Sequence, residues 1–191
     1  MQTLWEGKCE WDQPLPADIQ AKWYDLTRDL QQAVLIEIPM YYFKEESITT
    51  GAKLHVFTDA SQSAYGSCAY IVAGNQSILV MAKNRVAPLK QITLPKLELM
   101  GAVVGARLAR HLLGNLGDME IHFWSDSQIV LNWIMCIKPL KTFIANRVKE
   151  IKNLVKNQQW KHCPTDMNPA DMLTRGLTSE KSKDINDLWM N

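Results

Sequence analysis

Long apolar runs are missing from this chain of 191 residues. No stretch approaches the roughly 20 apolar residues that a membrane-spanning helix needs. The first residues, MQTLWEGKCEWDQ, also lack the basic-then-apolar order of a signal peptide. Internal repeats and low-complexity segments are missing as well. These absences predict a soluble intracellular globular protein that has no membrane partner.

Sulfur and imidazole metal-binding patterns are missing too. The four cysteines, Cys9, Cys68, Cys136 and Cys163, form no C-x-x-C pair, and the four histidines form no H-E-x-x-H motif. A zinc site or a disulfide framework is therefore not expected, and buried free thiols are the better interpretation.

The chain as a whole has almost no net charge, at +1, but its acidic and basic residues are unevenly distributed. Residues 1–50 hold nine acidic and four basic side chains, whereas residues 51–175 hold fifteen basic and eight acidic ones. The middle of the protein is therefore basic, which suits a polyanionic partner as well as a merely solvated face.

The N-terminal segment, residues 1–50, is predicted to be a separate piece. Apolar residues at spacings of three and four, among them Trp23, Leu26 and Leu30, predict a helix from about Ala17 to Val34. Residues 44–51 have no such period and are predicted to form a linker. A main domain over residues 51–178 and a C-terminal extension over residues 179–191, expected to continue in a longer gene product, complete the division.

The main domain has the pattern of an α/β fold. Strands are predicted at residues 54–58, 65–73, 78–82, 119–125 and 159–163, and helices at 95–113, 127–137, 139–156 and from Asn168-Pro169 onward. Pro95 is expected to begin the first of these helices, and Gly114 to end it. The order predicts a five-stranded mixed sheet that is flanked by helices.

Four acidic residues stand out by their placement. Glu98 is the only charged residue in the apolar helical segment LELMGAVVGA, where an ionised carboxylate needs a partner. Asp59 and Asp126 each follow an apolar strand, and Asp171 lies in the turn Asn168-Pro-Ala-Asp. Each also has a structural interpretation: Glu98 as an exposed first-turn acid, Asp126 as a helix cap, and Asp171 at the third position of a helix capped by Asn168.

A convergence of these carboxylates would need cations to offset their repulsion. An all-oxygen ligand set favours Mg²⁺ or Mn²⁺. Two such ions, roughly 4 Å apart, suit in-line displacement at a phosphodiester, so the pattern indicates a nuclease.

Longer motifs carry a family resemblance. The segments are FTDASQSAYG (57–66), AKNRVAPLKQITLPKLELMGA (82–102), HFWSDSQIVLNWI (122–134), FIANRVKEI (143–151) and NPADMLTRG (168–176). With them the chain resembles the ribonuclease H domain of BEL/Pao-type retrotransposon polyproteins. Residues 1–50 resemble the end of the reverse transcriptase that precedes this domain. Pro95 departs from many retroviral and cellular ribonucleases H, which carry Gln at that position.

The resemblance implies an enzyme that hydrolyses the RNA strand of RNA/DNA hybrids. It implies that Asp59, Glu98, Asp126 and Asp171 are catalytic and bind two Mg²⁺ ions, for which Mn²⁺ can substitute. The implied partners are the hybrid and the polymerase domain of the same polyprotein. The implied location is a retroelement particle in the cytoplasm, with the nucleus as a second possibility.

Basic residues supply candidate contacts to the nucleic acid. They are Arg85, Lys90 and Lys96 near the expected site, and Lys141, Lys149, Lys152 and Lys156 on one side of the helix at residues 139–156.

Two other functions stay open. A DDE-type integrase shares the fold, but its acids run Asp, Asp, Glu, whereas here the Glu comes second. A catalytically silent, nucleic-acid-binding or structural remnant of a retroelement polyprotein is the other alternative. The presence of all four acids argues against it.

Overall fold

The computed structural model describes residues 4, 7, 10–33, 51–156 and 159–176. The predicted linker, apart from Gly51, lies outside these residues, as do Cys9 and the predicted C-terminal extension. Within them, the predicted free thiols are confirmed: Cys68 and Cys163 are buried, and Cys136 is half-buried. No helix of the described part is long and apolar enough to cross a bilayer.

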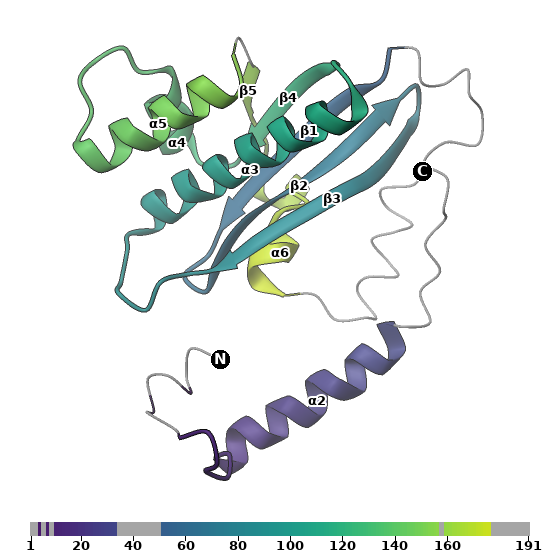
Figure 1. The fold of residues 1–191 in the computed structure, drawn as a ribbon, viewed down its shortest axis with the longest axis vertical. Coiled ribbons are helices and arrows are strands. Elements are labelled where there is room, and N and C mark those ends of the chain that lie inside the picture. The colour runs from purple at the N-terminus through teal and green to yellow at the C-terminus, as the bar shows by residue number, and fades with distance from the viewer. Residues whose placement is uncertain (1–3, 5–6, 8–9, 34–50, 157–158, 177–191) are drawn as a thin grey trace.

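A five-stranded mixed sheet forms the centre of the fold, in the order β3-β2-β1-β4-β5 (Figure 1). Its strands are β1 (Lys53–Ala60), β2 (Ala64–Ala73), β3 (Gln76–Val86), β4 (Glu120–Ser125) and β5 (Gln159–His162). β2 is antiparallel to β1 and β3, whereas β4 is parallel to β1 and β5. The predicted architecture is therefore confirmed.

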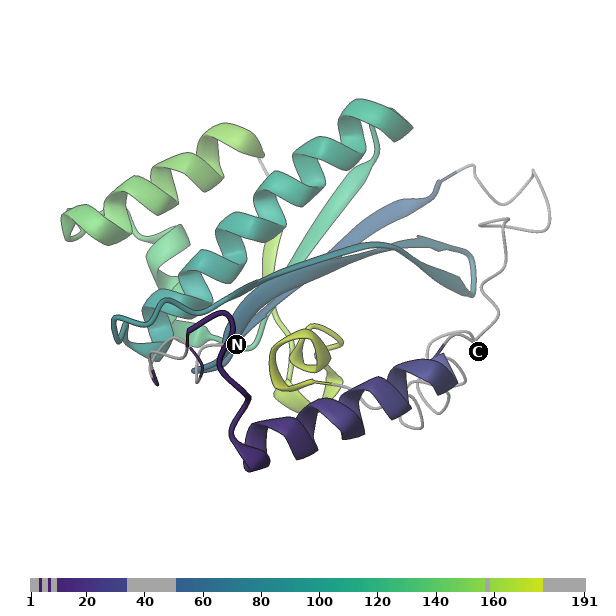
Figure 2. The same ribbon diagram turned by 60° about the horizontal axis from the view of Figure 1, so that its bottom comes forward.

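Helices cover the two faces of the sheet unequally (Figure 2). α3 (Leu94–Leu116) and α5 (Thr142–Leu154) lie over one face, and α4 (Gln128–Met135) leads from β4 towards α5. The opposite face carries α6 (Asp171–Arg175), which follows the short 3-10 helix η2 (Thr165–Met167). The main core lies under α3, where Leu54, Leu99 and Phe123 are fully buried.

Helix α3 packs unusually close to strand β1. A Cβ atom on Gly101 would lie 2.8 Å from the Asp59 carbonyl oxygen, and one on Gly105 would lie 2.7 Å from Thr58 Cγ2. Both glycines follow Glu98 at helical spacing, so the face that approaches β1 is also the face that carries Glu98.

The boundaries of three predicted elements were wrong. α3 continues through Gly114 and ends at Leu116, where Gly117 takes the positive φ of 88°. β3 extends to Val86 because its polar end, Lys83-Asn84-Arg85, pairs with β2 at the sheet edge. α5 spans only Thr142–Leu154, so Lys141 and Lys156 flank this helix.

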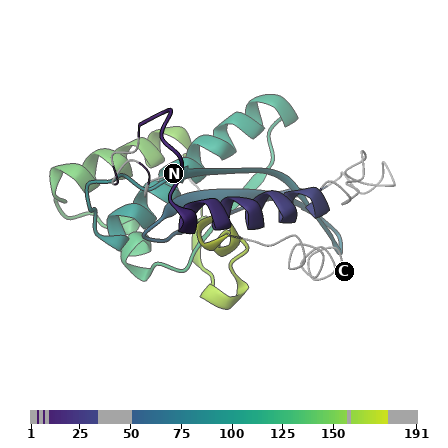
Figure 3. The same cartoon turned by 90° about the horizontal axis from the view of Figure 1, so that it is seen from below.

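The N-terminal helix α2 (Ala17–Ala33) confirms the predicted helical appendage. It lies on the same side of the sheet as α6 (Figures 2 and 3). Its apolar stripe remains exposed, with Trp23 at 56%, Leu26 at 50% and Leu30 at 52% exposure. The helix therefore adds little to the core of the main domain.

Candidate active site

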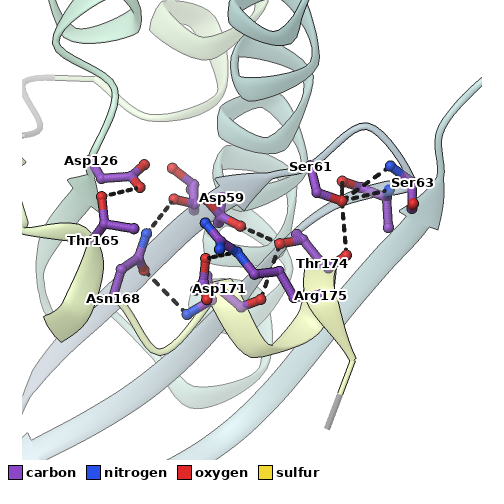
Figure 4. Close-up of polar contacts among 12 residues, drawn as sticks. Asp59, Ser61, Ser63, Asp126, Thr165, Asn168, Asp171, Thr174 and Arg175 are labelled. Atoms are coloured by element: carbon purple, nitrogen blue, oxygen red, sulfur yellow. Dashed lines mark hydrogen bonds and ion pairs between the residues drawn. The ribbon is translucent and has the colours of Figure 1, made fainter.

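The four predicted acids lie around one edge of the sheet. Thr58 of β1 pairs in parallel with Ser125 of β4, so the next residues, Asp59 and Asp126, reach the same edge side by side. Asp171, the first residue of α6, lies beside Asp59 (Figure 4). Glu98 comes from the first turns of α3.

Asp59 is the most buried of the four, with 6% of its surface exposed. Burial first, and then the charges of Asp126 and Asp171, raise the pKa of this carboxyl to about 6, against a hydrogen bond from Thr174 that lowers it. Thr174 Oγ1 donates this bond to Asp59 Oδ2. Burial and the neighbouring carboxylates therefore disfavour the ionised form of Asp59.

Glu98 is half-buried, so the interpretation as an exposed first-turn acid is wrong. Its Oε2 accepts a hydrogen bond of 2.5 Å from Ser127 Oγ. Burial raises the pKa of Glu98, the Ser127 bond lowers it, and the charge of Asp126 raises it. Glu98 is thus coupled to the acid that follows β4.

Asp126 is not the cap of the helix after it. Ser127 takes that role, because its Oγ accepts a 3.3 Å hydrogen bond from the Val130 N–H. Asp126 Oδ2 accepts a 3.0 Å bond from Thr165 Oγ1. Asp126 Oδ1 is buried, and the described part of the chain supplies no hydrogen-bond partner for it.

Asp171 begins α6, whereas the sequence suggested a helix capped by Asn168. The helix starts later than that, but the Asn168 side chain still bonds its first turn as a cap would: its Oδ1 accepts from the Ala170 N–H at 3.2 Å, while its Nδ2 donates to the Thr58 carbonyl at 3.1 Å. Asn168 thus ties the start of α6 to the end of β1. Asp171 Oδ1 lies 2.6 Å from Arg175 Nε, an ion pair that lacks hydrogen-bond alignment.

A family model matches about two thirds of the chain. The model of the Pao retrotransposon-like RNase H-like domain matches residues 1–127, which include Asp59, Glu98 and Asp126. The chain belongs to this family. The match confirms the resemblance that the motifs indicated. No curated protein sequence matches this RNase H-like domain.

Solved structures share the fold of this RNase H-like domain. The N-terminal RNase H domain of Rv2228c from Mycobacterium tuberculosis, a fusion with maltose-binding protein, matches 70% of this chain and 99% of its own, with TM-score 0.52 and 16% identity. RNase H1 of Halobacterium salinarum matches 70% and 98%, with TM-score 0.44 and 14% identity. LC11-RNase H1 in complex with an RNA/DNA hybrid matches 70% and 99%, with TM-score 0.47 and 15% identity. Such low identities show the fold alone.

The acids of this RNase H-like domain are of the ligand type that divalent cations prefer, although their side chains are not arranged around a common point. Among the described residues, no group of three or more His, Cys, Asp or Glu side chains is arranged to hold a metal ion. The ligand type nonetheless fits, because Asp126 Oδ1 is buried without a partner and Asp59 is repelled by two neighbouring carboxylates. Oxygen donors of this kind are those that Mg²⁺ and Mn²⁺ prefer.

Three hydroxyl residues at the site were missed by the sequence analysis. They are Ser127, Thr165 and Thr174, each bonded to one of the acids. Ser127 directly follows Asp126, and Thr174 lies one helical turn after Asp171, so both could have been suspected. Nothing in the sequence pointed to Thr165, because η2 meets β4 only in the folded chain.

Three of the seven predicted nucleic-acid contacts line two hollows of the surface. Arg85 lines a hollow of about 200 Å³ over α3, together with Arg107 and Arg147. Lys149 and Lys152 line a second hollow of about 340 Å³ along α5. Both of these lysines are exposed, while Ile144, Val148 and Ile151 of α5 are buried as predicted. The binding of Arg85, Lys149 and Lys152 to nucleic acid stays a prediction, as it does for Lys90, Lys96, Lys141 and Lys156.

Proposed function

We propose that this RNase H-like domain cuts the RNA strand of RNA/DNA hybrids by a two-metal mechanism, as part of a retrotransposon reverse transcriptase. Membership of the Pao retrotransposon-like family supports the reaction class. The chain order Asp59, Glu98, Asp126 favours it over a DDE-type integrase, in which Glu comes last.

One observation carries the proposal: a buried Asp59 lies close enough to Asp126 and Asp171 for their charges to raise its pKa. Three carboxylates from β1, the end of β4 and α6 thus share one edge of the sheet. A purely structural cluster would place cations between them. Here Arg175 alone pairs with one of the four, Asp171, among the described residues.

Asp59, Glu98, Asp126 and Asp171 are the residues that would hold two Mg²⁺ ions, with Mn²⁺ as a substitute. The chemistry that such ions supply is activation of water and stabilisation of the leaving oxygen at a phosphodiester. The protein's own part is to keep four acids from separate elements in place while their like charges repel. Burial of Asp59 and the close approach of α3 to β1 leave this edge little room to rearrange.

The proposed partners follow from charge and family. Residues 51–175 carry a net positive charge that suits the phosphates of a hybrid. The polymerase domain of the same polyprotein is the proposed protein partner, and residues 1–50 are proposed to be its end. Retroelement particles in the cytoplasm are the proposed location, with the nucleus as the second.

Cleavage of a labelled RNA/DNA hybrid with Mg²⁺ tests the proposal. Asp126→Asn should lower the cleavage rate by more than about 100-fold, because loss of an outer partner of a metal ligand alone costs 10–100-fold. The variant should keep its fold, since it loses one of the repelling charges. Asp118→Asn, in the exposed turn before β4, is the matched control and should cleave normally.

Three outcomes would contradict the proposal. Equal cleavage by the wild type and Asp126→Asn would remove the assigned site. Digestion of duplex DNA in preference to the hybrid would favour the integrase. Hybrid binding with no cleavage would favour the silent remnant.

A further inference from the structure

Hydroxyl groups from separate elements contact three of the four acids (Figure 4 draws two of these pairs). Thr174 of α6 donates to Asp59 Oδ2. Thr165 of η2 donates to Asp126 Oδ2 at 3.0 Å. Ser127, the N-cap of α4, donates to Glu98 Oε2 at 2.5 Å. Each acid and its hydroxyl come from different parts of the chain, so the pairs exist only in the folded protein.

Thr174 holds a special place among the three. Its side chain is buried, and its Oγ1 also lies 3.0 Å from the carbonyl oxygen of Asp171. A hydroxyl has one proton to donate, so Thr174 Oγ1 lies between two acceptors and donates to one of them at a time. Thr174 therefore joins the Asp59 carboxylate to the backbone of the residue that carries the fourth acid.

The rest of α6 is anchored without touching a carboxylate. Ser61 Oγ donates to the Thr174 carbonyl at 2.8 Å, and Asn84 Nδ2 donates to the Leu173 carbonyl at 3.2 Å. A helix of five residues has no stability of its own, so these bonds and Asn168 keep α6 on the sheet. The Thr174 hydroxyl is thus not needed to attach α6, which leaves its contact with Asp59 to be explained.

We propose that Thr174 is a positioning residue, whose hydroxyl sets the Asp59 carboxylate relative to Asp171 so that the two can share a divalent cation. In the same way, the Thr165 hydroxyl positions the Asp126 carboxylate, and the Ser127 hydroxyl positions the Glu98 carboxylate. This inference rests on the proposed function, because it concerns the same acids.

A neutral donor suits this task better than a cation. A lysine or arginine would neutralise the carboxylate and compete with the metal ion for it. A hydroxyl fixes one oxygen in space and leaves the charge in place. Because a carboxylate oxygen has two lone pairs, an oxygen that accepts one hydroxyl proton can still accept a second interaction.

The test replaces Thr174 in the full chain by Val, which has nearly the same shape but no hydroxyl, and by Ser, which keeps it. Binding of Mn²⁺ is measured by calorimetry, and hybrid cleavage is measured in parallel. Thr174→Val should weaken Mn²⁺ binding by about 10- to 100-fold and slow cleavage to a similar degree. Thr174→Ser should restore both to within about threefold of the wild type, since the donor returns.

Thr165→Val gives a second test on an exposed residue, where a folding defect is not expected. It should weaken Mn²⁺ binding by about tenfold. Thr27→Val is the matched control, because Thr27 lies on α2 and, within the part of the chain that the structure describes, its hydroxyl donates to the Tyr24 carbonyl of its own helix. This control should bind Mn²⁺ and cleave like the wild type.

The outcomes separate the two proposals. If the wild type binds Mn²⁺ and cleaves while Thr174→Val and Thr165→Val equal it, the positioning role is wrong and the proposed function stands. The positioning role is also wrong if Thr174→Ser is as impaired as Thr174→Val, because packing then explains the loss. A wild type that neither binds Mn²⁺ nor cleaves overturns both proposals.

Discussion

The acidic edge of the sheet, formed by Asp59, Glu98, Asp126 and Asp171, differs from the lysine-bearing side of α5 in how its side chains are held. At the acidic edge, side chains far apart in sequence fix each other, as when Thr174 bonds Asp59 across 115 positions. On α5, Lys149 and Lys152 are exposed and come from neighbouring turns of one helix. Every acid is buried or half-buried, whereas these lysines face solvent.

This difference matches two kinds of task. Chemistry at a phosphodiester needs charges placed to within a fraction of an ångström, because a shift of 1 Å can cost about 100-fold in rate. Attraction of a polyanion needs only positive charge near the surface, since released counterions supply much of the binding free energy. We therefore expect changes at the acidic edge to have large effects, and changes on α5 to have small ones.

Among changes that leave the four acids in place, the largest effect is expected from Gly101→Ala, which breaks the close contact of α3 with β1. The new Cβ would lie 2.8 Å from the Asp59 carbonyl oxygen, so helix and strand must separate. Overpacking of this kind costs about 1–3 kcal/mol of unfolding free energy. The shift moves Glu98 away from Asp59, and hybrid cleavage should fall by about 100-fold.

Gly114→Ala in the same helix is the control, because no atom lies within 4 Å of the added Cβ. It should stabilise the protein by about 0.5–1 kcal/mol, since Ala favours helix more than Gly. Thermal unfolding and the cleavage assay measure both variants. Equal stability and equal cleavage rates for Gly101→Ala and Gly114→Ala would show that the distance between α3 and β1 does not determine the geometry of the site.

An intermediate effect is expected from pH, through Asp59. Its folded pKa of about 6 lies above the ordinary value of 3.8, so the folded state holds this proton more tightly than the unfolded state. The resulting stabilisation is present below pH 4 and is lost as pH rises through 6. The shift corresponds to about 3 kcal/mol at most.

Urea unfolding of the metal-free wild type and of Asp59→Asn between pH 4 and 7.5 measures this effect. The advantage of the wild type over Asp59→Asn should shrink as pH rises. A constant difference between the two curves would show that the folded protein does not raise the pKa of Asp59.

The smallest effect is expected from Lys149→Gln and Lys152→Gln on α5. If each lysine meets one phosphate, each change should lower the slope of log affinity against log salt by about one. The cleavage rate at saturating hybrid should stay unchanged. Hybrid binding over a salt series measures this, with Lys22→Gln on α2 as the control. An unchanged slope would make the α5 surface a merely solvated face.

Much of the fold was predictable because its signals are local. Apolar runs bounded by turn residues located the five strands, and the 3.6-residue period of α5 identified its buried side at Ile144, Val148 and Ile151. The candidate acids could be chosen for a similar reason. A lone Glu98 among apolar residues, and an Asp directly after each of two strands, conflict with simple burial.

The details that the sequence did not predict depend on contacts with distant segments of the chain. Asn168 was predicted as a helix cap from local sequence, but its second bond, from Nδ2 to the distant Thr58 carbonyl, has no local signal. Gly114 looks like a helix end, but α3 continues for two more residues along the sheet. Thr165 carries no local signal at all.

By itself, the sequence determined the kinds of element, their order and the choice of four candidate acids, because periodicity and side-chain chemistry are properties of the chain alone. Only the tertiary structure decided that Ser127, and not Asp126, caps α4, that α3 approaches β1 at Gly101, and that Thr174 bonds Asp59. These contacts join residues brought together by the parallel pairing of β1 with β4 and by the return of α6 to the sheet. Distances of that kind arise from packing and are not encoded in any single segment.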